Sequence, residues 1–354
     1  MQDRNSGHSS SKTESNMSYS LLYLRDGLRM TSNVRRMTWG YLTLVLSMLV
    51  WGYVVSTTHV LMVRADDFLG LIGWLPVAFW VALGLSAVTI AIAKDAQNTG
   101  LAQLSWVVLV LILIGTPWFV ETNPRGLQSA YYPASMAIQV AREGHVSAKL
   151  WDPKLNPYVW YPGFPLLSAT LLVTSSVPLE YALKYYPVLL VLAVVWGIFT
   201  LARQALENKG PAILATSLFI GFFWTNQMAY NPQMIGFIIY LTLLVLYCQL
   251  HRRKTARHVL LLLLPVFFSL VLMHPLTALV ALGFSVALVI LKIATRHKSA
   301  RASLILSLLF GGIYITWSLY QASVFMQTAF ISMRPFLDNP ALFFDLMVAR
   351  KVFG

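Results

Sequence analysis

Apolar stretches long enough to cross a lipid bilayer recur along this chain of 354 residues. The hydrocarbon core of a bilayer is roughly 30 Å thick, and a helix satisfies its own backbone hydrogen bonds there. We predict membrane spans at about residues 39–63, 68–92, 101–120, 187–206, 212–224, 232–250, 259–273, 276–293 and 302–320. A further apolar segment, residues 164–178, is short for a span. The sequence therefore predicts an all-α polytopic membrane bundle of about nine to ten apolar segments.

The composition supports a membrane protein and argues against a nucleic-acid partner. Hydrophobic residues make up 57% of the chain and charged residues 11%, whereas soluble domains carry roughly 25% charged residues. The net charge of +13 comes mainly from basic residues in the short connections between apolar segments. This is the topological bias of membrane proteins, so we expect no nucleic acid. The single cysteine, Cys248, excludes a disulfide framework and a thiolate metal cluster within the chain.

The chain divides into a tail, a membrane domain and a C-terminal segment. Residues 1–38 begin with a polar stretch and contain no apolar run before Trp39, which predicts a disordered cytoplasmic tail. Residues 39–320 form the transmembrane domain, which includes a long loop at 121–163. Residues 321–354 predict an amphipathic C-terminal segment.

Three groups of basic residues predict which ends of the spans face the cytoplasm. They are Arg25, Arg29, Arg35 and Arg36; Arg252, Arg253, Lys254 and Arg257; and Lys292, Arg296, Lys298 and Arg301. We therefore expect a multi-pass protein of the cell membrane with a cytoplasmic N-terminus. The three groups agree only if residues 164–178 enter and leave the bilayer on one side. In this re-entrant alternative, the 121–163 loop, the 225–232 turn and the His274–Pro275 junction share the non-cytoplasmic face. If the segment spans instead, everything after it inverts, against the usual bias.

The long loop contains a pattern typical of a surface helix. Pro133 can occupy a first helical turn, Tyr132, Met136 and Val140 repeat at four-residue spacing, and Gly144 can end the helix. Residues 129–144 therefore predict an amphipathic helix on the membrane surface, with Arg142 towards water.

A few polar side chains stand where they could carry chemistry. Glu121 follows the third span, where it could act as a general base or a metal ligand; alternatively it pairs with Arg125. His274 lies between two long apolar runs, and an ionisable group at that depth suggests either function or a hydrogen-bonded structural role. Asn226 and Asn231 could bind a hydroxyl-rich ligand, although Asn231-Pro232 favours a turn.

The layout of this region resembles the GT-C superfamily of polytopic glycosyltransferases, which use polyprenyl-phosphate-linked sugars. The matching pieces are Glu121, the 129–144 helix ending in AREGHV, and Trp160-Tyr161-Pro162 before Phe164. The resemblance covers about residues 101–250. The chain departs from the family pattern by its three spans before the loop and by lacking a large soluble C-terminal domain.

The resemblance implies a sugar transfer at the non-cytoplasmic face. Glu121 would activate the acceptor or hold a divalent cation. Apart from the resemblance, His274 is a second candidate catalytic group because of its depth between two apolar runs. Arg125, Arg142, Lys149 and Lys154 would be available for the lipid phosphate; the alternative is contact with anionic headgroups. Trp160 and Tyr161 would stack on a sugar ring, or else belong to the interfacial aromatic belt.

Two other functions stay open. A transporter would place charged groups within several spans, and these spans are nearly free of them. A non-catalytic or truncated membrane subunit, with membrane-protein partners, is the other alternative. Soluble-enzyme chemistry has little support, because the chain has no phosphate-cradling glycine loop, HExxH or serine nucleophile elbow.

Overall fold

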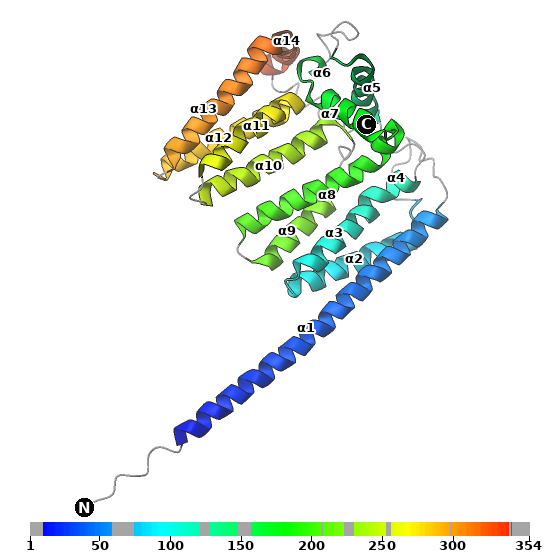
Figure 1. Cartoon of the computed structure of the whole chain (residues 1–354), viewed down its shortest axis with the longest axis vertical. Helices are drawn as coiled ribbons and strands as arrows, with labels where there is room; N and C mark the ends of the chain where they lie inside the picture. Colours follow the sequence, from blue (N-terminus) through cyan, green and yellow to red (C-terminus); the bar gives the residue numbers. More distant parts are fainter. Residues whose placement is uncertain are drawn as a thin grey trace, which may run out of the picture. The chain divides into compact units, whose positions relative to one another are not determined.

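The protein is an all-α polytopic membrane bundle, as the sequence predicts. The computed structural model describes residues 10–58, 74–120, 128–146, 157–206, 208–222, 230–252, 256–297, 299–339 and 341, and the regular structure in these ranges is helical throughout (Figure 1). Within the described residues, seven helices are long and apolar enough to cross a membrane. They are Val34–Thr57, Val77–Asp95, Thr99–Val120, Tyr181–Ala205, Pro232–Leu250, Pro275–Ala294 and Ala300–Gln321. Three shorter apolar helices accompany them: Gly163–Ser175, Lys209–Phe222 and His258–Met273.

The helices belong to two compact units. The first unit, Met1–Glu121 with Leu206–Phe222, contains α1 (Ser10–Thr57), α2 (Val77–Asp95), α3 (Thr99–Val110), the π-helical turn η2 (Leu111–Gly115), α4 (Thr116–Val120) and α9 (Lys209–Phe222). The second unit, Thr122–Ala205 with Phe223–Gly354, contains α5 (Gln128–Glu143), α6 (Pro157–Trp160), α7 (Gly163–Ser175), α8 (Leu179–Ala205), α10 (Pro232–Arg252), α11 (Ala256–Met273), α12 (Pro275–Ala294), α13 (Ala300–Thr316), the π-helical turn η4 (Trp317–Gln321) and α14 (Ser323–Asp338).

The start of α1 differs from the sequence prediction. The helix begins at Ser10, so residues 10–38 are helical where the polar composition predicts a disordered tail. The apolar part that could cross a membrane begins only at Val34. Leu21, Leu24 and Leu28 recur at helical spacing, a signal that the polar composition of the preceding residues obscures.

The first unit is held together by small residues and hydroxyl groups between helices. The Ser47 hydroxyl donates to the Ala82 carbonyl oxygen at 2.8 Å, and it joins α1 to α2. The Trp106 indole N–H donates to the Ser217 hydroxyl at 2.9 Å, and it joins α3 to α9. Helices in lipid associate through close packing and such interhelical hydrogen bonds, because lipid supplies no hydrophobic driving force between them.

The second unit packs its helices around two clusters of buried apolar side chains. The rings of Phe267 and Phe310 stack at 4.1 Å between α11 and α13. Helices α12 and α13 run antiparallel, with Lys292 Nζ donating to the Ser303 hydroxyl at 2.7 Å and Ser285 bonded to Ser307 further along. Helices α8 and α10 instead run parallel, because Leu183 clusters with Ile235 while Gly197 lies against Leu241.

Helix α7 starts and finishes at the same end of the second unit. At its first residue, Gly163 lies against the backbone of Leu272 in the last turn of α11. After α7 the chain enters α8, where Leu183 shares a buried cluster with Phe164 of α7 and Met273 of α11. Helix α7 therefore does not carry the chain to the opposite end, as the re-entrant alternative for residues 164–178 predicts.

The contacts of α7, α8, α10 and α12 show which helix termini lie together in the second unit. We call the end that holds the starts of α7, α8, α10 and α12 the His274 end. Helices α10 and α12 run from it towards Arg252 and Lys292, and α13 begins beside Lys292 because Ser303 bonds that amine. The described members of the second and third basic groups, Arg252, Lys292 and Arg301 among them, thus share the opposite end, as the charge bias predicts.

Candidate functional site at the helix break around His274

His274 is the only residue between α11 and α12. Its backbone is extended (φ −155°, ψ 98°), and Pro275 opens α12. Proline cannot continue the preceding helix but suits the first position of the next one. The Thr277 N–H donates to His274 Nδ1 at 3.3 Å, and the Thr277 hydroxyl lies 2.7 Å from the same nitrogen. The imidazole therefore caps α12.

Two glycines let neighbouring helices approach this break. A Cβ built on Gly236 of α10 would lie 2.9 Å from the His274 Cβ. A Cβ on Gly163 of α7 would lie 2.9 Å from the Leu272 carbonyl group, which is backbone and cannot move aside as a flexible side chain can. The break is thus enclosed by α7 and α10 at distances that only glycine allows.

A pocket of about 360 Å³ opens beside the break, between α10 and α12. It is lined by Gln233, Met234, Phe237, Tyr240, His274, Leu276, Thr277 and Val280. An apolar wall with a few polar groups is the usual composition of a small-molecule site. Gln233, His274 and Thr277 supply polar groups from the first turns of α10 and α12, so a ligand with oxygen or nitrogen atoms would meet them at the His274 end.

The hydrogen bonds of His274 determine what its ring can offer to a ligand. Because a backbone N–H can only donate, Nδ1 must accept, and the proton of the neutral ring is on Nε2. His274 lies in the connection outside both helices, and burial lowers the pKa of its imidazole. The neutral ring is therefore favoured, and it can donate from Nε2 to an oxygen-rich ligand.

Asn231 has a structural role. Its side-chain oxygen accepts from the Met234 N–H at 2.9 Å and caps α10, in agreement with the turn alternative. The preceding residue, Tyr230, donates its hydroxyl to Ser168 at 2.8 Å, and its ring contacts Phe164. These contacts fix the start of α10 against α7.

Trp160 and Tyr161 also lie at the His274 end, where both are in contact with other parts of the protein. The Trp160 carbonyl oxygen accepts from the Trp317 indole N–H at 3.0 Å, which joins α6 to η4. Tyr161 is 1% exposed within the apolar core, so its ring has no free face for a sugar. Burial raises the pKa of the Tyr161 hydroxyl, and the Ser318 hydroxyl partly offsets the effect.

The helix predicted at residues 129–144 is present as α5, which packs on α7. Met136 and Val140 are buried and Arg142 is exposed, as predicted, whereas Tyr132 is 46% exposed. The four-residue spacing predicts that Tyr132 faces the protein. Ala134 takes this place, since it lies in the buried cluster that contains Phe164. Arg142 is not among the residues that line the pocket.

Four predicted site residues lie outside the described ranges: Glu121, Arg125, Lys154 and Asn226. Lys149, the further candidate for the phosphate, does so too. Within the ranges that are described, no three metal-ligating side chains gather in one place. The divalent cation thus stays a prediction that depends on Glu121.

Two residues of the pocket are weakly marked in the sequence. Thr277 follows His274 by three residues, the spacing of a helix cap, so the pair can be found from sequence once Pro275 marks the helix start. Gln233 is marked in the sequence only as one of the amides of TNQMAYNPQ that suit a hydroxyl-rich ligand, because its place in the pocket depends on how α10 is rotated against α12.

The chain has no significant match among protein-family models, curated proteins or solved structures. The resemblance to the GT-C superfamily therefore rests on the layout of the sequence.

Proposed function

We propose that this protein is a membrane glycosyltransferase of the GT-C type that transfers a sugar from a polyprenyl-phosphate donor at the His274 end. The observation that carries the proposal is the pocket of about 360 Å³ with Gln233, His274 and Thr277 at its polar rim. Its size falls in the range of small-ligand sites, and its polar groups are neutral donors and acceptors suited to hydroxyl-rich ligands. Helices α7 and α5 adjoin the same end.

In the proposed reaction an acceptor hydroxyl attacks the anomeric carbon of the donor sugar. The bond from that carbon to the phosphate oxygen breaks, and the acceptor proton passes to a base, for which Glu121 is the proposed group. Charge then grows on the departing phosphate. The N–H at His274 Nε2 could stabilise that charge by donating to a phosphate oxygen.

The placement of charged residues favours such an interfacial site over a translocation path. In the seven candidate spans, every Asp, Glu, Lys and Arg lies within the first or last four residues. Lys184 and Lys292 are among them, near the ends of α8 and α12. Transporters that bind ions or polar substrates commonly place such groups near the bilayer midplane.

The test is transfer of a radiolabelled sugar from a polyprenyl phosphate by the full chain in proteoliposomes. Glu121→Gln removes the proposed base at nearly constant size, and His274→Asn keeps a capping oxygen but removes the Nε2 donor. We expect both variants to lose transfer by at least about 100-fold, the usual range for acid-base and oxyanion groups. His297→Asn, at an exposed residue beyond α12, is the matched control.

Full transfer by both folded variants would refute the proposed catalytic roles. If wild-type protein moves the lipid-linked sugar across the bilayer without transferring it, the transporter alternative gains support. A wild-type chain that neither transfers nor transports would favour the non-catalytic subunit.

A further inference from the structure

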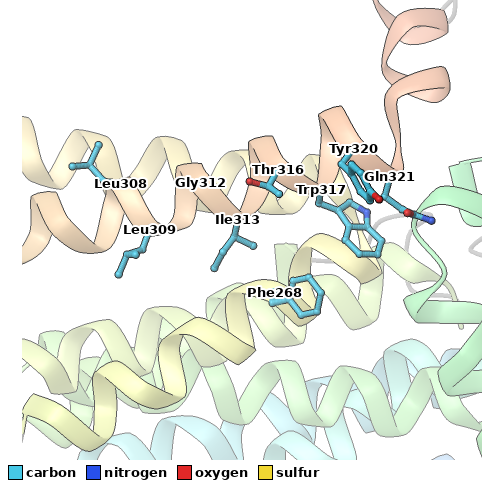
Figure 2. A pocket seen from close by; sticks show the side chains of 9 residues that line it. All are labelled: Phe268, Leu308, Leu309, Gly312, Ile313, Thr316, Trp317, Tyr320 and Gln321. Carbon is cyan, nitrogen blue, oxygen red and sulfur yellow. The ribbon is translucent and has the colours of Figure 1, made fainter.

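An open groove of about 540 Å³ runs along α13 beside α11 in the second unit, away from the His274 pocket. It is lined by Phe268, Leu308, Leu309, Gly312, Ile313, Thr316, Trp317, Tyr320 and Gln321. Figure 2 shows Phe268 rising from α11 towards α13, with Tyr320 and Gln321 at one end of the row and Leu308 at the other. One helix thus supplies most of the groove.

The groove is apolar along its length and polar at one end. Leu308, Leu309 and Ile313 form the apolar part, whereas Thr316, Tyr320 and Gln321 carry the polar groups. The polar end lies at the His274 end of the unit, because the neighbouring Trp317 bonds the Trp160 carbonyl oxygen. The change from apolar to polar follows the direction from the bilayer interior to its surface.

The length of the groove corresponds to about one leaflet. Residues 308 to 321 extend over about 20 Å at the rise of an α-helix, compared with about 15 Å for half of a hydrocarbon core. These residues form the second part of the candidate span Ala300–Gln321. A chain that enters from the bilayer surface would reach roughly to the midplane.

Two features shape the groove. A Cβ built on Gly312 would meet no atom within 4 Å, so the missing side chain leaves space open at mid-length. Near the polar end the Phe268 and Trp317 rings meet edge to face at 5.7 Å. The indole N–H is already bonded to Trp160, so Trp317 offers a ligand its ring alone.

We propose that this groove binds one hydrocarbon chain of a bilayer glycerolipid, with the glycerol region at Thr316, Tyr320 and Gln321. The charges of the lining argue for this occupant over the tail of a polyprenyl phosphate. Among the groove residues there is no Lys, Arg or His to pair with a phosphate at the chain terminus, whereas hydroxyl and amide groups suit a glycerol backbone. The inference does not depend on the proposed glycosyltransferase activity.

The test uses the full chain in phosphatidylcholine nanodiscs that contain a phosphatidylcholine with a diazirine in the middle of one chain. After irradiation, labelled residues are identified by peptide mass spectrometry. We expect labelling of Leu308, Leu309 and Ile313 several-fold above that of Leu279 and Ile290, which are exposed apolar residues on α12. Equal labelling of the three groove residues and the two α12 residues would show an ordinary lipid-facing surface and overturn the proposal.

Gly312→Leu fills the groove, and it should reduce labelling of the three groove residues to the level found on α12. Gly283→Leu is the matched control, since a Cβ at Gly283 also meets no atom within 4 Å but lies on α12. Undecaprenyl phosphate serves as a competitor, with phosphatidic acid as its charge control. Loss of groove labelling with undecaprenyl phosphate alone would identify a polyprenyl tail as the occupant and overturn the glycerolipid assignment.

Discussion

Gly236 lies directly against His274, at a distance that leaves no room for a methyl group. A Cβ on Gly236 would be 2.9 Å from the His274 Cβ. Because α10 carries Gly236 and the break carries His274, this contact sets the separation of the two walls of the pocket.

Gly236→Ala should therefore destabilise the protein, although alanine is the better helix former. The overpacking costs about 1–3 kcal/mol, which is offset by up to about 1 kcal/mol of helix propensity. Thermal unfolding in detergent should show a lower Tm for this variant. Gly283→Ala, in open space on α12, should raise the Tm slightly or leave it unchanged. Equal shifts for both variants would contradict the close approach.

Acid should weaken the fold through His274. Burial lowers the pKa of its imidazole in the folded protein, whereas the unfolded chain titrates near about 6.5. The stabilising contribution of the neutral ring is thus present above that pH and is lost as the pH falls through the lower folded value. His274→Asn keeps a cap that does not titrate. Its Tm should fall less steeply than that of the wild type between about pH 7 and pH 5, and parallel curves would exclude His274 as the cause.

The return of α7 predicts which exposed positions share a side of the membrane. His145, after α5, and Ser176, between α7 and α8, should lie on one side, and His297, between α12 and α13, on the other. After Cys248→Ala, single cysteines at these positions can be tested with a membrane-impermeant maleimide in oriented vesicles. We expect 145 and 176 to react from the non-cytoplasmic side and 297 only after permeabilisation. Reaction of 176 together with 297 would mean that α7 crosses the bilayer.

The helices of this fold are largely predictable from sequence because each depends on its own composition. The predicted spans 232–250 and 276–293 match α10 and α12 to within two residues at each end. Pro275 marks the break at His274 because its ring cannot continue α11. The return of α7 is predictable from charge bias, since only that path places the Arg252 and Lys292 groups on the same side as the basic group at Arg25 to Arg36.

The candidate site is harder to predict from sequence. It depends on which face each helix turns towards its neighbours and on how closely the helices pack. Tyr161 looks like an interfacial aromatic in sequence, yet it is buried in an apolar cluster with residues of several helices. Tyr132 fits the apolar spacing of α5, yet the smaller Ala134 faces the close packing against α7. Gly163 and Gly236 enclose the break, a role that a single sequence does not reveal because glycine is common in membrane helices generally.

The one-residue connection at His274 limits how the pocket can open. With so little chain between them, α11 and α12 cannot separate at this end without unwinding a turn. The Thr277 N–H, bonded to the imidazole, ties the ring to α12 as well. Any widening needed to admit a bulky ligand would therefore have to come from α10, whose first turn is held by the Asn231 cap and by the Tyr230 bond to Ser168. Opening the pocket would therefore require breaking these two hydrogen bonds, while α11 and α12 stay in place.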